Sequence, residues 1–179
     1  MRDLNIAYGG SRQAKTWVNK TIGFNKLKER LKVTIRTPES AEEYAKMNKV
    51  QRDLAKDHGG FVGGVLKGGR RKIDTVESRS MLSLDGDRIT KEFLEEFEAT
   101  FPYTSVLYTT HSSTEENPRA RIVCPLTRDV TPEEFVAVSR YVAQMLGIDY
   151  FDECSYLPNQ LMYWPSTPPV SYTHLRAHE

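Results

Sequence analysis

Two aspartates stand on either side of Gly86, directly after an apolar run at residues 80–84 that is typical of a short strand. Side chains two positions apart on a strand project to the same face, so Asp85 and Asp87 can converge on one hard divalent cation. The pair therefore predicts a site for Mg²⁺ or Mn²⁺. An acidic turn at the end of a strand is the alternative.

His111 and Asp152 could complete such a site, because each stands beside another predicted strand. His111 follows a β-branched and aromatic run and could donate a hydrogen bond to a triphosphate. Asp152 precedes the run 160–164 and could be a third metal ligand, with Asp149 and Glu153 as its rivals. Three carboxylates and a histidine at neighbouring strand ends predict metal-assisted phosphoryl chemistry, in which two metal ions position an in-line displacement.

Arg119 and Arg121 are alternate residues of a predicted strand at 119–126 and so share one of its faces. Guanidinium groups in this arrangement are suited to clamp phosphate oxygens. Pairing with the many glutamates of the chain is the alternative. Together with the metal site, the two arginines favour nucleotidyl transfer from a nucleoside triphosphate to a 3′ oxygen.

The charged residues are divided unevenly along the 179 residues, although the formal net charge is only +1. Residues 1–79 hold 18 Lys and Arg against 9 Asp and Glu, a balance of +9, whereas residues 80–179 hold 7 against 15, a balance of −8. The basic half suits contacts to the phosphates of a nucleic-acid template rather than readout of its bases. Two solvated faces that attract each other are the alternative.

Six glycines lie between residues 59 and 69, followed by a basic cluster. We expect a flexible segment that lays its backbone along phosphates, with Lys67, Arg70, Arg71 and Lys72 as nucleic-acid contacts. The segment lacks the Gly-Lys-Ser/Thr ending of a Walker loop, so a P-loop NTPase is disfavoured. A hairpin with glycine turns and solvated cations is the alternative.

Hydrophobic periodicity predicts six core elements in the order strand, helix, strand, strand, helix, strand. The strands are expected at 80–84, 103–110, 119–126 and 160–164, and the helices after Thr90 and Thr131. Pro132 and Glu134 provide the first helical residue and the capping box of the second helix, which Gly147 ends. This order is that of a ferredoxin-like or RNA-recognition-motif (RRM-like) βαββαβ core, in the α/β (α+β) class.

The segment upstream of this core is expected to form an N-terminal α/β extension. It contains a possible strand at 3–8 and helices near 25–32 and from 38 to about 56. We therefore expect a basic N-terminal subdomain at 1–77 and an RRM-like catalytic core at 78–167.

The last ten residues, 170–179, follow Thr167-Pro168-Pro169 and show no periodicity that joins them to the core. The string resembles the translation of a sequencing adapter, so we expect a non-native tail and leave it out of the fold prediction. A native disordered tail is the alternative.

The composition also limits which cofactors the protein is expected to bind and where in the cell it is expected to be found. The two cysteines, Cys124 and Cys154, have no nearby Cys or His partner, so no zinc site is expected. No apolar run approaches the roughly 20 residues that cross a bilayer, and the N-terminus lacks the apolar stretch of a secretory signal. We expect a cytoplasmic protein with no membrane partner.

The motifs together resemble those of the archaeo-eukaryotic primase superfamily. That superfamily has three motifs: two aspartates separated by one residue, a histidine two positions after a small residue, and a single aspartate later in the chain. In this sequence the matching residues are Asp85-Gly86-Asp87, Thr109-Thr110-His111 and Asp152. The string 151–167 is similar to the stretch of phage and plasmid primase-polymerases that runs from the third motif into a Pro-Gly-Thr-like end. Over about residues 1–169 the chain resembles the N-terminal primase-polymerase portion of the virulence-associated protein E family of phages and mobile elements.

This resemblance implies Asp85, Asp87 and Asp152 as metal ligands and His111 as a contact to the incoming triphosphate. It also implies a DNA template or primer and nucleoside triphosphates as partners, in the cytoplasm of a bacterial host. Relatives usually continue into a superfamily 3 type helicase, which would follow after about residue 169.

Two residues depart from the family pattern. Gln160 stands where related primases commonly carry a basic residue, and Ser166 replaces the usual glycine.

Two other functions are alternatives to the primase. The first is a non-catalytic replication-origin or single-stranded DNA-binding module, in which Tyr108, Tyr163 and Trp164 would stack on bases. The second is a metal-dependent nuclease that uses the same acidic cluster.

Overall fold

The computed structural model describes residues 2–169 and 175–178. The helices are α1 (Phe24–Lys32), α2 (Ala41–Lys46), α3 (Lys49–Ala55), α4 (Lys91–Thr100) and α5 (Pro132–Leu146). The strands are β1 (Leu4–Gly9), β2 (Val18–Ile22), β3 (Ile35–Arg36), β4 (Gly60–Val62), β5 (Gly64–Leu66), β6 (Val76–Gly86), β7 (Ser105–Thr109), β8 (Ala120–Val130), β9 (Met162–Tyr163), β10 (Ser166–Thr167) and β11 (Leu175–His178). This mixture of helices and largely antiparallel strands confirms the predicted α+β class.

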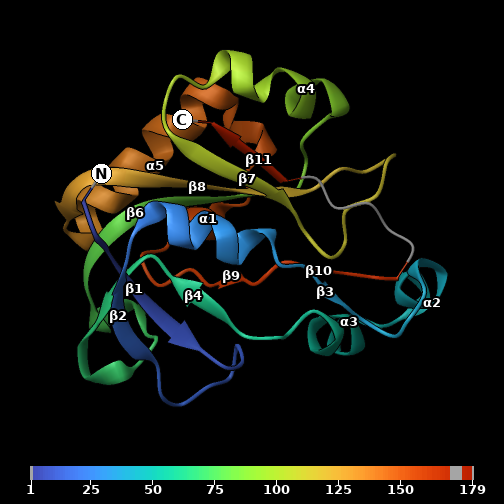
Figure 1. Ribbon diagram of the computed structural model, residues 1–179, viewed down its shortest axis with the longest axis horizontal. Coiled ribbons are helices and arrows are strands. Elements are labelled where there is room, and N and C mark those ends of the chain that lie inside the picture. Colours follow the sequence, from blue (N-terminus) through green and yellow to red (C-terminus); the bar gives the residue numbers. More distant parts are fainter. Residues whose placement is uncertain (1, 170–174, 179) are drawn as a thin grey trace.

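The largest sheet has the strand order β11-β7-β8-β6-β5, and α4 and α5 cover one of its faces (Figure 1). Leu84, Ile122, Phe97 and Ala143 belong to the buried cluster between this sheet and the two helices. The capping box of Thr131 and Glu134 and the end at Gly147 are present in α5, as the sequence predicts. The segment from β6 to α5 therefore has the predicted strand, helix, strand, strand, helix order.

A second sheet, of order β2-β1-β4-β9, lies with α1 against the other face of the large sheet (Figure 1). The buried residues of this layer come from both sheets and from α1, and they include Leu4, Ile6, Leu27, Leu31, Phe61, Val106 and Val123. The N-terminal extension and the predicted core thus share one hydrophobic cluster. Strand pairs also cross the predicted boundary at residue 77, because β5 pairs with β6, β9 with β4, and β10 with β3.

The predicted run at 160–164 contains a strand, β9, but its predicted place in the core sheet is wrong. The strand in that region, β9, pairs with β4 in the smaller sheet, and β5 takes the place beside β6. The segment just upstream makes only an isolated bridge, from Phe151 to Gly86 of β6. The pattern of apolar residues predicts a strand but carries no information about its partner, which tertiary packing selects.

The glycine-rich segment contains two strands and is not the flexible segment that the sequence predicts. Gly60 opens β4 and Gly64 opens β5, and both residues are buried. A Cβ atom at Gly60 would overlap the carbonyl oxygen of Met162, and one at Gly64 would overlap that of Ser78. Glycine is needed at both positions because neighbouring backbones approach too closely for any side chain.

Gly60→Ala should lower the free energy of unfolding by about 1–3 kcal/mol, because the added methyl group forces β4 away from β9. Gly10→Ala is the matched control, since a Cβ at Gly10 meets no atom within 4 Å. The control should change stability by about 0.5 kcal/mol or less in urea denaturation. Equal stability of the two variants would contradict this account of the segment.

The single helix predicted from 38 to about 56 is in fact two short helices. Asn48 interrupts it, because its side chain accepts a hydrogen bond from the backbone N–H of Gln51 and forms a capping box that starts α3. Ser40 and Glu43 form the corresponding box at the start of α2. The two helices lie at one end of the molecule, beside the β3–β10 pair (Figure 1).

Part of the predicted tail at 170–179 forms a strand. β11 pairs antiparallel with β7, with Leu175 opposite Tyr108 and His178 opposite Ser105. The rest of the predicted tail, residues 170–174 and 179, lies outside the described residues.

Candidate functional site

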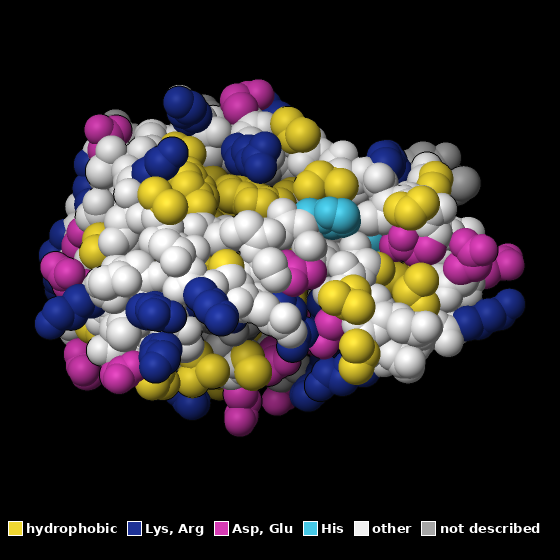
Figure 2. Space-filling model, turned by 90° about the horizontal axis from the view of Figure 1, so that it is seen from below, with side chains coloured by type: hydrophobic (Ala, Val, Ile, Leu, Met, Phe, Trp, Pro, Cys, Tyr) yellow, Lys and Arg dark blue, Asp and Glu magenta, His cyan; other side chains and the backbone are white. Residues whose placement is uncertain are grey.

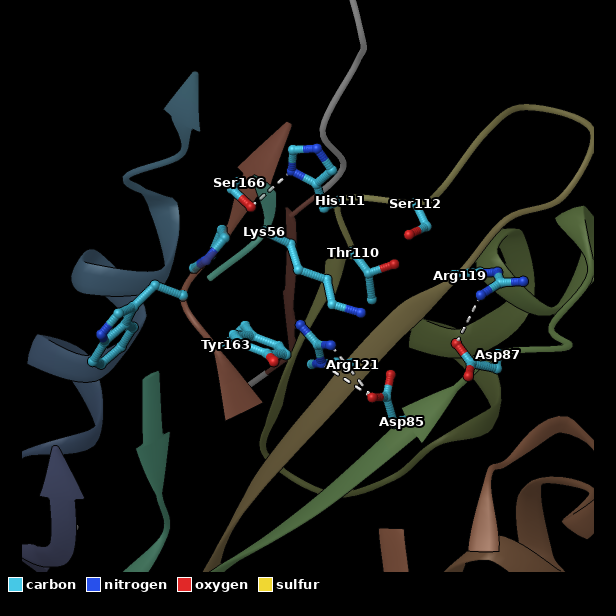
Figure 3. Close-up of a pocket in the computed structure, with 12 residues that line it drawn as sticks. Lys56, Asp85, Asp87, Thr110, His111, Ser112, Arg119, Arg121, Tyr163 and Ser166 are labelled. Carbon is cyan, nitrogen blue, oxygen red and sulfur yellow. Dashed lines mark hydrogen bonds and ion pairs between the residues drawn. The ribbon is translucent and has the colours of Figure 1, made fainter. Parts of the chain in front are cut away.

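Asp85 and Asp87 lie at the end of β6, and Arg119 and Arg121 lie at the start of β8, on the same side of one pocket (Figure 3). The antiparallel register of β6 and β8 places Arg121 directly opposite Asp85. The pairing of the two strands therefore brings together the carboxylates and the arginines that the sequence singled out separately.

Arg121 and Asp85 form a largely buried ion pair. The Nε and Nη2 atoms of Arg121 both lie 3.3 Å from Oδ2 of Asp85. Although burial opposes its charge, the neighbouring Asp85 carboxylate holds the pKa of Arg121 above its usual range. The other oxygen of Asp85, Oδ1, is buried and has no hydrogen-bond partner among the described residues. Such an oxygen has a lone pair available for a cation.

Asp87 is more exposed and more weakly paired. Its Oδ1 lies 3.5 Å from Nη1 of Arg119, and both side chains are more than a third exposed. Burial raises the pKa of Asp87, and the negative charges of Asp85 and Asp152 raise it further. Repulsion among carboxylates is relieved when a cation binds between them. Asp85 and Asp87 therefore have the chemistry of a divalent-cation site.

Asp152 lies near this pair, but its carboxylate has another role. Its backbone N–H donates to the carbonyl oxygen of Asp85 at 3.0 Å. Its Oδ1 accepts a hydrogen bond from the N–H of Cys154 at 2.9 Å and caps a short 3₁₀ helix, Glu153–Tyr156. Over residues 2–169, no three His, Cys, Asp or Glu side chains are gathered closely enough to hold a metal. The side chain of Asp152 would have to leave its capping bond to become a third ligand.

His111 lines the same pocket, just beyond the end of β7 (Figure 3). Both of its ring nitrogens have protein partners: Nδ1 lies 2.9 Å from Oγ of Ser166, and Nε2 lies 3.0 Å from Oε1 of Glu39. The ring also packs against Tyr44, with centroids 4.5 Å apart. Burial lowers the pKa of His111, although Glu39 acts in the opposite direction. This network fixes the imidazole at the wall of the pocket.

The lowered pKa of His111 predicts a pH dependence of stability. In the unfolded chain His111 takes up a proton near pH 6.5, whereas the buried ring takes it up only at lower pH. The unfolded state thus binds more protons in this window, and stability should fall as the pH falls below about 6.5. His111→Gln should lose less stability between pH 7 and pH 5.5 in urea denaturation. An equal loss in both proteins would contradict the assignment.

Comparison with models of known protein families identifies the family of this chain. A family model described as VapE N-terminal domain matches residues 1–175. The chain belongs to this family. The match confirms the resemblance to virulence-associated protein E of phages and mobile elements that the motifs indicate. No curated protein and no solved structure matches the chain. Among the described helices, none is long and apolar enough to span a membrane.

The four cations predicted to contact nucleic acid in this VapE N-terminal domain lie outside the pocket. Lys67, Arg70 and Lys72 are exposed. Arg71 is partly buried: it donates to the carbonyl oxygens of Asn159 and Arg12, its guanidinium lies 5.3 Å from the ring centre of Trp17, and burial lowers its pKa. Arg71 is therefore held by structural partners, whereas the other three side chains are open to solvent.

The face seen in Figure 2 bears Lys and Arg side chains in several separate groups, with Asp and Glu side chains among them. It also has a hollow lined by hydrophobic side chains, which Lys and Arg side chains border. The +9 balance of residues 1–79 is thus not gathered into a single basic stripe on this face.

Lys56, Tyr163 and Ser166 also line the pocket. Sequence reasoning missed Lys56, and it considered Tyr163 only for stacking on bases and Ser166 only as a departure from the family pattern. Lys56 comes from the end of α3, whereas Tyr163 and Ser166 come from β9 and β10. No local pattern marks their place in the pocket. Tyr163 and Ser166 reach it through the pairing of β9 with β4 and of β10 with β3, whereas Lys56 reaches it from the C-cap position of α3.

Proposed function

We propose that this VapE N-terminal domain is a primase or DNA polymerase module that carries out metal-dependent, template-directed nucleotidyl transfer from NTP or dNTP, in the replication of a phage or mobile element. The observation that supports this best is a single pocket that combines two carboxylates, Asp85 and Asp87, with two guanidinium groups, Arg119 and Arg121. A triphosphate with its divalent cation needs both kinds of group side by side.

In this proposal Asp85 and Asp87 hold Mg²⁺ or Mn²⁺, with the unpartnered Oδ1 of Asp85 as one ligand atom. The bound cation would neutralise charge on the triphosphate and activate the attacking 3′ oxygen. Arg119, whose pair with Asp87 is long and exposed, is free to turn toward a phosphate oxygen. Arg121 sits deeper and holds the Asp85 carboxylate in position. His111 shapes the wall of the pocket and stands close to the entering triphosphate.

A template strand would then lie outside this pocket and would be held by contacts to its phosphates. Lys67, Arg70 and Lys72 are exposed and available for such contacts. Arg71 contributes indirectly, because its hydrogen bonds to Asn159 and Arg12 support the segment that carries the other three.

One observation favours a second candidate, a non-catalytic module that binds single-stranded DNA. Asp85 and Asp87 each have an arginine partner, as carboxylates with a purely structural role do. In that case DNA binding would be independent of divalent cations and of both aspartates.

The experiment that separates the two candidates is nucleotide incorporation on primed and unprimed single-stranded templates, with labelled NTP or dNTP and Mg²⁺ or Mn²⁺. The proposal expects labelled products that need the template and disappear with EDTA. DNA binding without any product, in either metal and with either class of nucleotide, would favour the non-catalytic module.

A further inference from the structure

Among the described residues that line the pocket, Lys56 is the one cation that comes from the N-terminal part of the chain. Lys56 is the C-cap residue that directly follows α3, and its side chain extends toward Arg121 and Asp85 (Figure 3). It lines the pocket together with Asp85, Asp87, Arg119 and Arg121. The predicted core alone therefore does not build the pocket, because the segment that follows α3 contributes a side chain to it.

A small network, with one member outside the pocket and one in its wall, holds Lys56 in this position. Its Nζ lies 2.9 Å from Oδ1 of Asp53 and 5.6 Å from the ring centre of Tyr163. The other oxygen of Asp53 is bound by Nη1 of Arg12 at 2.5 Å. Because Arg12 neutralises Asp53 as well, Lys56 can share its charge with a second anion.

The charges that line the pocket show where that anion would bind. Asp85 pairs with Arg121, and Asp87 pairs with Arg119. Asp53, the carboxylate that binds Lys56, does not line the pocket. Lys56 thus brings a positive charge into the pocket without a carboxylate of the pocket to neutralise it. An ammonium group on a flexible stem is a common phosphate ligand.

We propose that Lys56 binds the triphosphate of the incoming nucleotide, and that α3 is thereby part of the nucleotide site. This inference rests on the proposed function. It adds a binding residue from a segment that carries none of the motif residues. The simple structural alternative is that Lys56 only ties the end of α3 to Asp53 and Tyr163.

The test is binding of inorganic triphosphate and of a nucleoside triphosphate to the full chain, by isothermal titration calorimetry with Mg²⁺. Lys56→Met, which keeps the aliphatic stem, should weaken both affinities about tenfold. Lys56→Arg should restore most of the loss. Lys49→Met, at an exposed lysine at the start of the same helix, is the matched control and should bind as the wild type does.

The outcomes separate this inference from the proposed function. If the wild type binds triphosphate and Lys56→Met binds it equally well, Lys56 has only a structural role and the proposed function stands. If the wild type binds neither ligand, both are wrong. A melting temperature of Lys56→Met close to that of Lys49→Met, measured without ligand, would show that a loss of affinity does not come from unfolding.

Discussion

Asp87→Asn should lower the rate of template-directed nucleotide incorporation about a hundredfold or more, while the fold stays intact. The loss is of the size expected when a preorganised electrostatic partner of the reacting groups is removed. Stability should change little, because the pair of Asp87 with Arg119 is long and its side chains are 37% and 41% exposed. Asp87→Asn also removes a partly buried negative charge and its repulsion with Asp85, the two causes, burial first, that raise the pKa of Asp87.

Asp149→Asn provides the matched control, since Asp149 is exposed and does not line the pocket. It should keep both the activity and the melting temperature of the wild type. Asp85→Asn is a less clean variant, because it leaves the largely buried guanidinium of Arg121 without its counter-charge. Full activity of Asp87→Asn would remove the carboxylate pair from the mechanism.

The largest expected effect on stability comes from Arg79, which is completely buried and has no carboxylate partner among its described contacts. Burial lowers its pKa to about 9. Its guanidinium donates to the carbonyl oxygens of Gly63, Pro158 and Met81 and to Oγ of Ser83, and it lies 3.9 Å from the ring centre of Phe135. Arg79→Met should destabilise the protein by about 3 kcal/mol or more, because several buried acceptors lose their donor.

Urea denaturation followed by circular dichroism would measure this effect. Arg88→Met, at an exposed arginine, is the control and should remain within about 0.5 kcal/mol of the wild type. A stability of Arg79→Met equal to that of Arg88→Met would mean that the buried hydrogen bonds of Arg79 contribute nothing net.

The elements with strong local signals could be predicted from the sequence. Thr131, Pro132 and Glu134 specify the start of α5, and Thr90 caps α4, because capping depends only on neighbouring residues. The same local reasoning identifies the pair of Asp85 and Asp87 at the end of a strand. It also identifies Arg121, whose strand pairs with the strand that carries Asp85.

The partners of the short strands could not be predicted, because β4, β5 and β9 contain only two or three residues each. Their positions depend on contacts between distant segments, such as that of Gly60 with Met162. The contribution of Lys56 to the pocket follows from the same packing and was invisible for the same reason.

The charge pattern was a partial guide. A balance of +9 in residues 1–79 suggested a surface for nucleic acid, yet Arg79 is buried and Arg71 is partly buried with backbone carbonyls as its acceptors. Guanidinium groups can satisfy carbonyl oxygens inside a protein, so a count of cations overestimates the charge available at the surface.

The most direct test of the proposed site is a crystal structure of the protein with Mn²⁺ and a non-hydrolysable nucleoside triphosphate, recorded with anomalous scattering from manganese. The proposal predicts an anomalous peak within coordination distance of carboxylate oxygens of both Asp85 and Asp87, with the triphosphate beside Arg119. A triphosphate bound with no manganese at these two aspartates, or manganese bound elsewhere, would contradict it.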